Sequence, residues 1–96
     1  MTLCKQHFFA MGEVSTPGVF EFREGMTVTQ AAVLFGGPTS LASLGRTLII
    51  RKGQLGGRQK VMQVDLRAVM QGKTEDVPLL IDDVIFIREF GVGGKP

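Results

Sequence analysis

The stretch Met11-Gly12-Glu13-Val14-Ser15-Thr16-Pro17-Gly18-Val19-Phe20 decides the fold, because it joins two apolar runs through the strongest turn signal in the chain. Proline presets the backbone for the second position of a β-turn, and glycine accepts the positive φ that a type II turn requires at the third. Pro17 and Gly18 therefore predict such a turn. The apolar runs at residues 8–11 and 19–22 predict two antiparallel strands, so a hairpin opens the domain.

A short helix is predicted over residues 27–35, and both of its ends are marked. Thr27 and Gln30 form a capping box, in which each side chain bonds a backbone N–H at the start of the helix. Gly36 and then Pro38 end it. About two and a half turns are marginal alone, so the helix is expected to pack on a sheet. Its apolar face has the spacing of a single helical stripe: Val28, Ala31, Ala32 and Phe35.

Two further strands and a second helix follow. Residues 46–51 and 61–64 are rich in β-forming side chains, and a glycine-rich stretch at residues 52–60 connects them. Asp65 is a candidate N-cap for a short helix over residues 66–71. We expect three apolar side chains to share one face of this helix: Leu66, Val69 and Met70.

The last predicted elements are extended. Pro78 lacks a backbone N–H, so we expect the segment at residues 77–80 at a sheet edge. The run Val84-Ile85-Phe86-Ile87 is wholly apolar, which is typical of a central, covered strand. Together the elements predict an α+β fold, in which the helix over residues 27–35 crosses one face of the sheet.

The order and spacing of these motifs resemble the SLBB domain, the soluble ligand-binding β-grasp module of polysaccharide export proteins. The resemblance rests on four segments: Gly12-Glu13-Val14, Pro17-Gly18-Val19-Phe20, Gly25-Met26-Thr27-Val28 and Phe35-Gly36-Gly37. It implies a β-grasp, which is a mixed sheet with one main packing helix. The family usually carries Pro-Gly-Asp before the last strand. Ile81-Asp82-Asp83 stands there in this chain, so the acidic residue is kept and the Pro-Gly turn is lost.

Length and composition bound the organisation of the chain. Its 96 residues, 44% of them hydrophobic, fit one globular domain, which we expect over residues 8–90. Residues 1–7 read as a tail without an apolar signal-peptide core, and residues 91–96 read as a linker or an added tail. No apolar run approaches the roughly 18 residues of a membrane span. The single cysteine, Cys4, excludes an internal disulfide.

No set of residues for catalysis, metal binding or a cofactor is visible. His7 is the only histidine, and one histidine with one cysteine cannot build a usual zinc site. The serines have no identifiable base, so nucleophilic hydrolysis lacks its proton acceptor. Asp82 and Asp83 are adjacent on an extended segment and should point to opposite sides, which favours a solvated turn over a cation site. The sequence therefore predicts a protein that is not an enzyme.

The charges are segregated along the chain. The basic run contains five basic residues and no acidic one: Arg46, Arg51, Lys52, Arg58 and Lys60. The later run contains five acidic residues and the single base Arg88: Glu75, Asp76, Asp82, Asp83 and Glu89. Both runs can be solvated faces. Alternatively, the basic face of one copy meets the acidic face of the next in a head-to-tail contact. No aromatic residue lies between Phe35 and Phe86, which argues against a nucleic-acid surface.

The resemblance implies a non-catalytic role in an outer-envelope protein that exports capsular or exopolysaccharide. Copies of the full-length protein would form a ring on the periplasmic side, with the polysaccharide and the inner-membrane export machinery as further partners. The expected ligand- or partner-binding residues are Gly12, Glu13, Pro17, Gly18, Gly36, Gly37 and Pro38. Two alternatives remain: a β-grasp docking module of a redox complex subunit, and a general protein-interaction domain.

Overall fold

The computed structural model describes residues 6–53 and 57–89 of the chain. Three predicted segments extend beyond this described part. The tail at residues 91–96 and Cys4 lie wholly outside it, and the tail at residues 1–7 and the connection at residues 52–60 lie partly outside it. The predicted tail also extends too far, because His7 is the first residue of the first strand.

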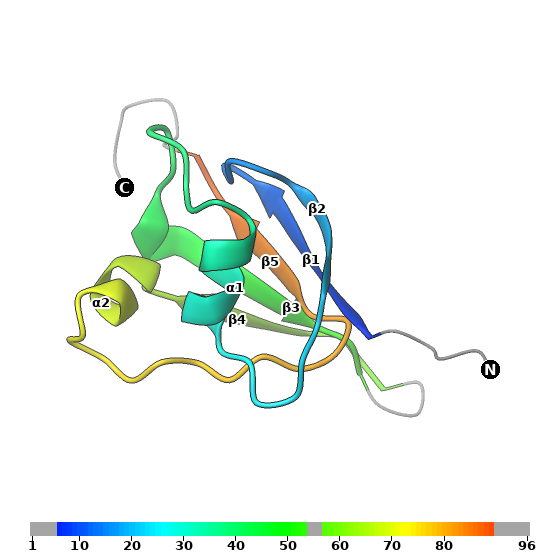
Figure 1. Ribbon diagram of the computed structural model, residues 1–96. Coiled ribbons are helices and arrows are strands. Elements are labelled where there is room, and N and C mark those ends of the chain that lie inside the picture. Colours follow the sequence, from blue (N-terminus) through cyan, green and yellow to red (C-terminus); the bar gives the residue numbers. More distant parts are fainter. Residues whose placement is uncertain (1–5, 54–56, 90–96) are drawn as a thin grey trace.

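A five-stranded mixed sheet forms one layer of the domain (Figure 1). Its strands are β1 (His7–Gly12), β2 (Gly18–Glu21), β3 (Thr47–Arg51), β4 (Lys60–Val64) and β5 (Val84–Ile87), in the spatial order β2-β1-β5-β3-β4. β5 pairs parallel with β1 and antiparallel with β3. β1 pairs antiparallel with β2, and β3 with β4. The prediction that the apolar last strand is central is therefore confirmed.

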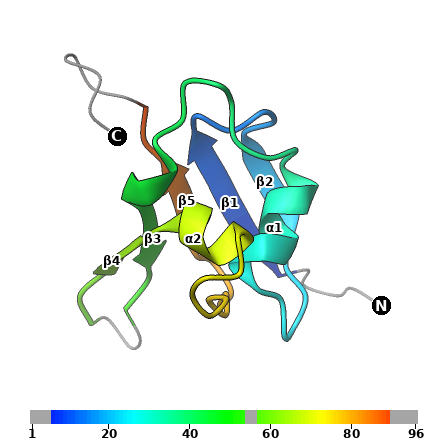
Figure 2. The ribbon, with the colours of Figure 1, turned by 90° about the vertical axis from the view of Figure 1, so that its left-hand side faces the viewer.

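Two helices form the second layer: α1 (Val28–Leu34) and α2 (Leu66–Met70). Both lie on the same face of the sheet, as the two views in Figures 1 and 2 show. The predicted capping box is present, since the Gln30 N–H donates to Thr27 Oγ1 and the Thr27 N–H donates to Gln30 Oε1. Asp65 caps α2 as predicted. The α+β fold with a main packing helix is thus confirmed.

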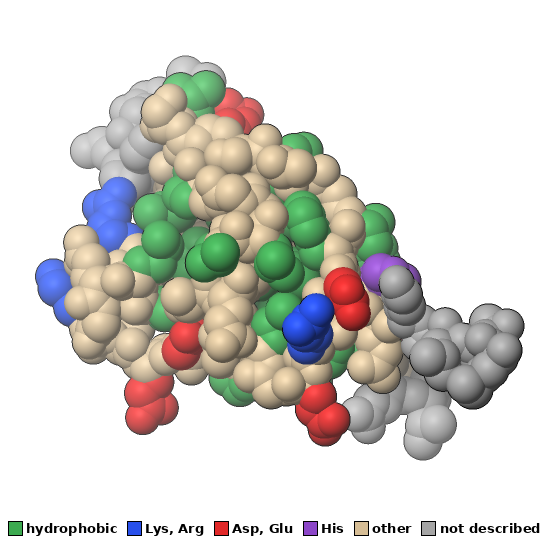
Figure 3. Space-filling view, in the orientation of Figure 1, with side chains coloured by type: hydrophobic (Ala, Val, Ile, Leu, Met, Phe, Trp, Pro, Cys, Tyr) green, Lys and Arg blue, Asp and Glu red, His purple; other side chains and the backbone are tan. Residues whose placement is uncertain are grey.

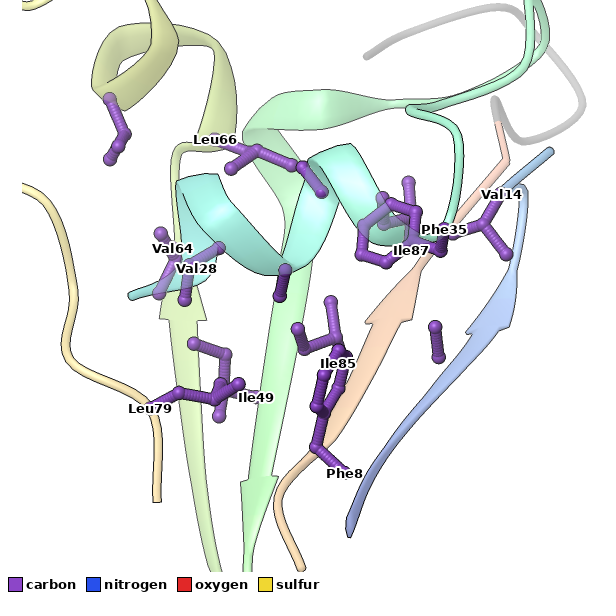
Figure 4. Packing of buried hydrophobic residues seen from close by; sticks show 14 of the residues in the cluster. Phe8, Val14, Val28, Phe35, Ile49, Val64, Leu66, Leu79, Ile85 and Ile87 are labelled. Carbon is purple, nitrogen blue, oxygen red and sulfur yellow. The ribbon is translucent and has the colours of Figure 1, made fainter. Parts of the chain in front are cut away.

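The core lies between the two layers and is built around the apolar stripe of α1. Val28, Ala31, Ala32 and Phe35 are all buried. They meet side chains from alternate positions of the strands, which Figure 4 shows from close by: Phe8, Ile49, Ile85 and Ile87. The ring of Phe8 also stacks on that of Phe20, with centroids 5.6 Å apart. Burial of this stripe supplies the stability that a seven-residue helix lacks alone.

Three local predictions are wrong. Met70 is 49% exposed, because α2 ends at that residue and only Leu66 and Val69 reach the core. The segment at residues 77–80 does not form a strand of the sheet; Pro78 makes an isolated bridge with Thr27 instead. This bridge and the hydrogen bond from the Val28 N–H to the Val77 carbonyl hold the segment against the start of α1.

The third wrong prediction is the type II turn at Pro17 and Gly18. Gly18 has a φ of 145°, whereas a type II turn needs about +80° at its third position. The connection between β1 and β2 is a wider loop, in which the Ser15 and Thr16 N–H groups donate to carbonyls at the end of α1 and just after it rather than across a tight turn. Gly18 nevertheless has a positive φ, in agreement with that part of the prediction.

The turn before β5 shows how the chain replaces Pro-Gly-Asp with Ile81-Asp82-Asp83. Asp82 adopts a φ of 66°, a left-handed conformation that aspartate tolerates better than most residues. Asp83 closes the turn, since its N–H donates to the Leu80 carbonyl and its carboxylate accepts from the Leu80 N–H at 2.8 Å. The turn therefore forms without proline or glycine.

Candidate functional site

Two loops that contain the predicted binding residues lie side by side in the structure. The first, residues 13–18, runs from the end of β1 to the first residue of β2, and the second, residues 36–39, follows α1. An isolated β-bridge pairs Val14 of the first loop with Pro38 of the second. Val14 is buried, so it anchors the first loop on the core. We call these two segments the loop pair.

Hydrogen bonds join the loop pair along its length. The Ser15 N–H donates to the Gly37 carbonyl at 2.9 Å, and the Thr39 N–H donates to the Glu13 carbonyl at 3.1 Å. The Thr39 hydroxyl donates to Glu13 Oε1 at 2.7 Å, which orients the carboxylate. A carboxylate has several acceptor sites, so Glu13 can accept further hydrogen bonds from a ligand hydroxyl.

The glycines of the second loop allow this close approach. Gly36 and Gly37 both have a φ of 80°, in the left-handed region that favours glycine. A side chain on Gly36 would place its Cβ 3.1 Å from the Cβ of Ser15. Pro17 and Gly18 are exposed where the first loop enters β2. The structure thus groups the predicted binding residues around a pair of hydrogen-bonded loops, and their role in binding stays a prediction.

A hollow of about 400 Å³ adjoins the loop pair at the end of the sheet. Gly12 and Glu13 line it together with Arg46, which the sequence assigned to the subunit contact. Sequence reasoning placed Glu89 in the acidic run and gave no site role to the other members of this lining: Leu48, Phe86, Ile87 and Arg88. They come together only because β5 lies between β1 and β3. The apolar run of β5 predicts a central strand but not which strands flank it.

The two charge runs meet within the domain at an ion pair between Arg51 and Asp83. Arg51 Nη2 lies 2.8 Å from Asp83 Oδ2, and its Nε–H donates to the same carboxylate. Arg51 also donates to the Pro78 carbonyl at 3.2 Å. Asp83 is fully buried. The expectation that Asp83 contacts a neighbouring subunit is therefore corrected: its carboxylate serves the fold of this domain.

The remaining members of the charge runs lie nearer the surface. Lys52 makes a long ion pair with Asp82, with Nζ and Oδ2 3.8 Å apart, and its side chain is 74% exposed. An exposed pair of this kind contributes about 0–1 kcal/mol. Arg58, Lys60 and Glu75 are exposed as well. In the view of Figure 3, apolar side chains gather in the middle of the molecule, and charged side chains are scattered around them.

Asp76 links the acidic run to the start of α1. Its Oδ1 accepts from the Thr29 N–H at 3.3 Å and from the Val77 N–H at 2.9 Å. Burial alone would raise the pKa of Asp76, but the hydrogen bonds from Thr27, Thr29 and Val77 together outweigh it and lower the pKa below 3.8. Asp76 therefore has a local structural role in addition to any part it plays in a subunit contact.

Among residues 6–53 and 57–89, no three His, Cys, Asp or Glu side chains come close enough together to hold a metal ion. Neither helix of the described chain has the length and apolar character needed to cross a membrane.

Comparison with known proteins assigns the family. No curated protein matches the chain. The family model of the SLBB domain matches residues 11–65, which is more than half of the 96 residues. The matched segment includes the loop pair, α1 and the β3–β4 hairpin, and the fold is the α+β arrangement that the family implies. The chain belongs to the SLBB family of ligand-binding domains.

Proposed function

We propose that this domain is a non-catalytic binding module of a polysaccharide export protein and acts on the periplasmic side of the cell envelope. The observation that carries the proposal is the SLBB match over residues 11–65, within which the loop pair is held on a rigid two-layer support. In this role the domain contacts the exported capsular polysaccharide or exopolysaccharide and neighbouring copies of the full-length protein in a ring.

The loop pair is the proposed contact for the glycan. It presents backbone groups and small polar side chains, such as Ser15 and Thr16, next to the oriented carboxylate of Glu13. Hydroxyl-rich chains are recognised by such donors and acceptors. The chain has no Trp or Tyr for stacking on sugar rings, so we expect weak and reversible contact, which suits a conduit through which a polymer must move.

A titration of the isotope-labelled domain with oligosaccharides of the exported polymer tests this contact. We expect amide chemical-shift changes confined to residues 13–18 and 36–39, with saturation in the millimolar range. Glu13→Gln should weaken the response, whereas Glu24→Gln, an exposed glutamate outside the loop pair, should leave it unchanged. Shifts that avoid both loops would reject the loop pair as the glycan contact.

The charges of the two runs that lie nearer the surface are the proposed contact between neighbouring subunits. The contact sets are basic on one side (Arg46, Lys52, Arg58 and Lys60) and acidic on the other (Glu75, Asp76 and Asp82). Exposed pairs are weak individually, so they would orient neighbours while other contacts of the parent protein hold the ring. Arg51 lies in the basic run, but its ion pair with buried Asp83 makes it unsuitable for testing this contact.

The test uses the full-length protein. The double variant Lys52→Glu/Arg58→Glu should impair ring assembly and polymer export, because it reverses two exposed charges of the basic run. The control is Lys73→Glu, which reverses one exposed charge outside that run. Normal assembly and export in the double variant would rule out the charge contact, and the family assignment would be unaffected.

A further inference from the structure

The sheet face opposite α1 and α2, which we call the outer sheet face, is apolar. Because side chains alternate along a strand, the positions between the core residues point to this face. One row across the strands consists of Val19, Phe9, Val84, Ile50 and Val61, as the strand register shows. The next row consists of Met11, Phe86, Leu48 and Gln63. Only Gln63 among these nine side chains is polar.

Such a face is unusual for a sheet that meets water. Sheets with one solvated face normally alternate between apolar residues inside and polar residues outside. Here Val19 and Val61 are each 58% exposed and Met11 is 48% exposed. Five more apolar residues on this face are half-buried: Phe9, Leu48, Ile50, Val84 and Phe86. In this domain both faces of the sheet are apolar, as they are in a sheet that is covered on both sides.

The size of the outer sheet face limits what its partner can be. Five strands about 4.8 Å apart and about five residues long give a footprint of roughly 300 Å². An apolar patch of that size on a monomer is commonly functional. It is smaller than the roughly 800 Å² that each partner contributes to a standard stable interface. An isolated domain should therefore associate weakly through this face.

We propose that the outer sheet face packs against the same face of a second copy of this domain, about a two-fold axis that runs along β5. β5 is the central strand, so this axis exchanges β1 with β3 and β2 with β4. The two edge valines, Val19 on β2 and Val61 on β4, are then placed opposite each other between copies. Two sheets packed face to face with their mean strand directions within about 30° of each other form the ordinary aligned sandwich.

The charges at the rim of the face favour this partner over others. Glu13 follows β1 and Arg46 precedes β3 at one end of the sheet, and both line the hollow beside Phe86. Because it exchanges β1 with β3, the axis places these opposite charges across from each other at this end of the sheet.

This inference does not depend on the proposed role in polysaccharide export. The head-to-tail contact proposed above uses the two charge runs, whereas the two-fold contact uses mainly the apolar positions of the strands and shares only Arg46 with it. Variants that alter only the outer sheet face therefore test it separately from the charge reversals.

Sedimentation velocity and amide chemical shifts of the domain, measured from about 20 μM to about 1 mM, test the proposal. We expect concentration-dependent dimer formation, with shift changes on β1, β3 and β5 at the outer-face positions. Val61→Lys and Val19→Lys should each weaken the dimer by about tenfold or more, because each places a charge in an apolar contact. The matched control is Val33→Lys, at an exposed position of α1, which should leave the dimer intact.

Cross-linking gives a second measurement that does not rely on weakened binding. Val84 lies on β5 and hence beside the proposed axis. In a Cys4→Ser background, a short bismaleimide should cross-link Val84→Cys into a dimer, because packed sheets lie about 10 Å apart, too far for a direct disulfide, and it should not cross-link Val33→Cys. A domain that stays monomeric at about 1 mM, or a dimer that Val61→Lys leaves intact, overturns the proposal.

Discussion

Gly12 shows at the scale of one residue how close packing dictates an amino acid. It has a φ of +85°, and a Cβ at this position would overlap the carbonyl oxygen of Ile87 and come within 2.9 Å of the Phe86 ring. The end of β1 therefore approaches β5 so closely that a side chain has no room. The same close approach brings Phe86 to the hollow beside Glu13.

Gly12→Ala should destabilise the domain more than Gly25→Ala does. Gly25 also has a φ of +85°, but a Cβ at that position would have no atom within 4 Å, so alanine there adds only backbone strain of about 1–2 kcal/mol. Overlap with the Ile87 carbonyl should add about 1–3 kcal/mol at Gly12. Urea denaturation of both variants measures the difference, and equal losses would show that β1 and β5 are not this close.

Asp83 is the second residue whose identity the fold dictates. Asp83→Asn should lower the free energy of unfolding by about 2–4 kcal/mol, somewhat less than for a fully buried pair, because Arg51 is 22% exposed. Asp82→Asn is the control, since asparagine also tolerates the left-handed conformation of the neighbouring position. Thermal melts of both variants should show a large decrease in Tm for Asp83→Asn only; similar melting temperatures would contradict the buried pair.

At the scale of elements, α1 depends on a segment far along the chain. The Val28 N–H donates to the Val77 carbonyl, and Asp76 accepts from the Thr29 N–H. The first turn of a helix has backbone N–H groups without intrahelical partners, and this segment satisfies two of them. The capping box contributes a further hydrogen bond through Thr27. The start of α1 is thus stabilised by both local and distant residues.

The lowered pKa of Asp76 makes part of this stability depend on pH. A carboxyl group with a lower pKa in the folded state stabilises the fold above its unfolded pKa, near 3.8, and loses that contribution as pH falls through the folded pKa. The difference in Tm between the native protein and Asp76→Asn should therefore shrink as pH falls below about 4. Glu75→Gln removes an equal charge from the same turn as a control. A difference that stays constant from about pH 7 to about pH 3 would contradict the role of Asp76.

At the scale of the whole molecule, the strand order places the last strand in the centre. β5 pairs with both β1 and β3, and its Ile85 and Ile87 are fully buried in the core. The SLBB match ends at residue 65, so the matched segment lacks this strand. Without β5 the sheet divides into two hairpins, which are marginal alone in water.

A fragment of residues 6–65 should therefore be unfolded, although it contains the whole family match. We expect a far-ultraviolet circular dichroism spectrum without cooperative thermal unfolding, and poor dispersion of amide proton shifts. Addition of a peptide of residues 77–89 should restore structure by supplying β5 and the Asp83 carboxylate. Cooperative unfolding of the fragment alone would show that β5 is dispensable.

The sequence by itself determined the elements whose chemistry is local. The capping box of Thr27 and Gln30, the glycine after α1 and the Asp65 cap of α2 could all be predicted, because they depend on residues three or four positions apart. The centrality of β5 could be predicted as well, since it follows from a wholly apolar run. The positions of the predicted binding residues in two loops were visible from their glycines and prolines.

Only the tertiary structure decided which distant residues meet. Arg51 and Asp83 are 32 positions apart, so the charge pattern along the chain could not show that they form an ion pair inside the fold. The predicted turn at Gly18 failed for the same reason, because hydrogen bonds to the loop after α1 determine the path of that connection. The apolar outer sheet face also emerged only once the strand register was known, because register decides which side of the sheet each residue occupies.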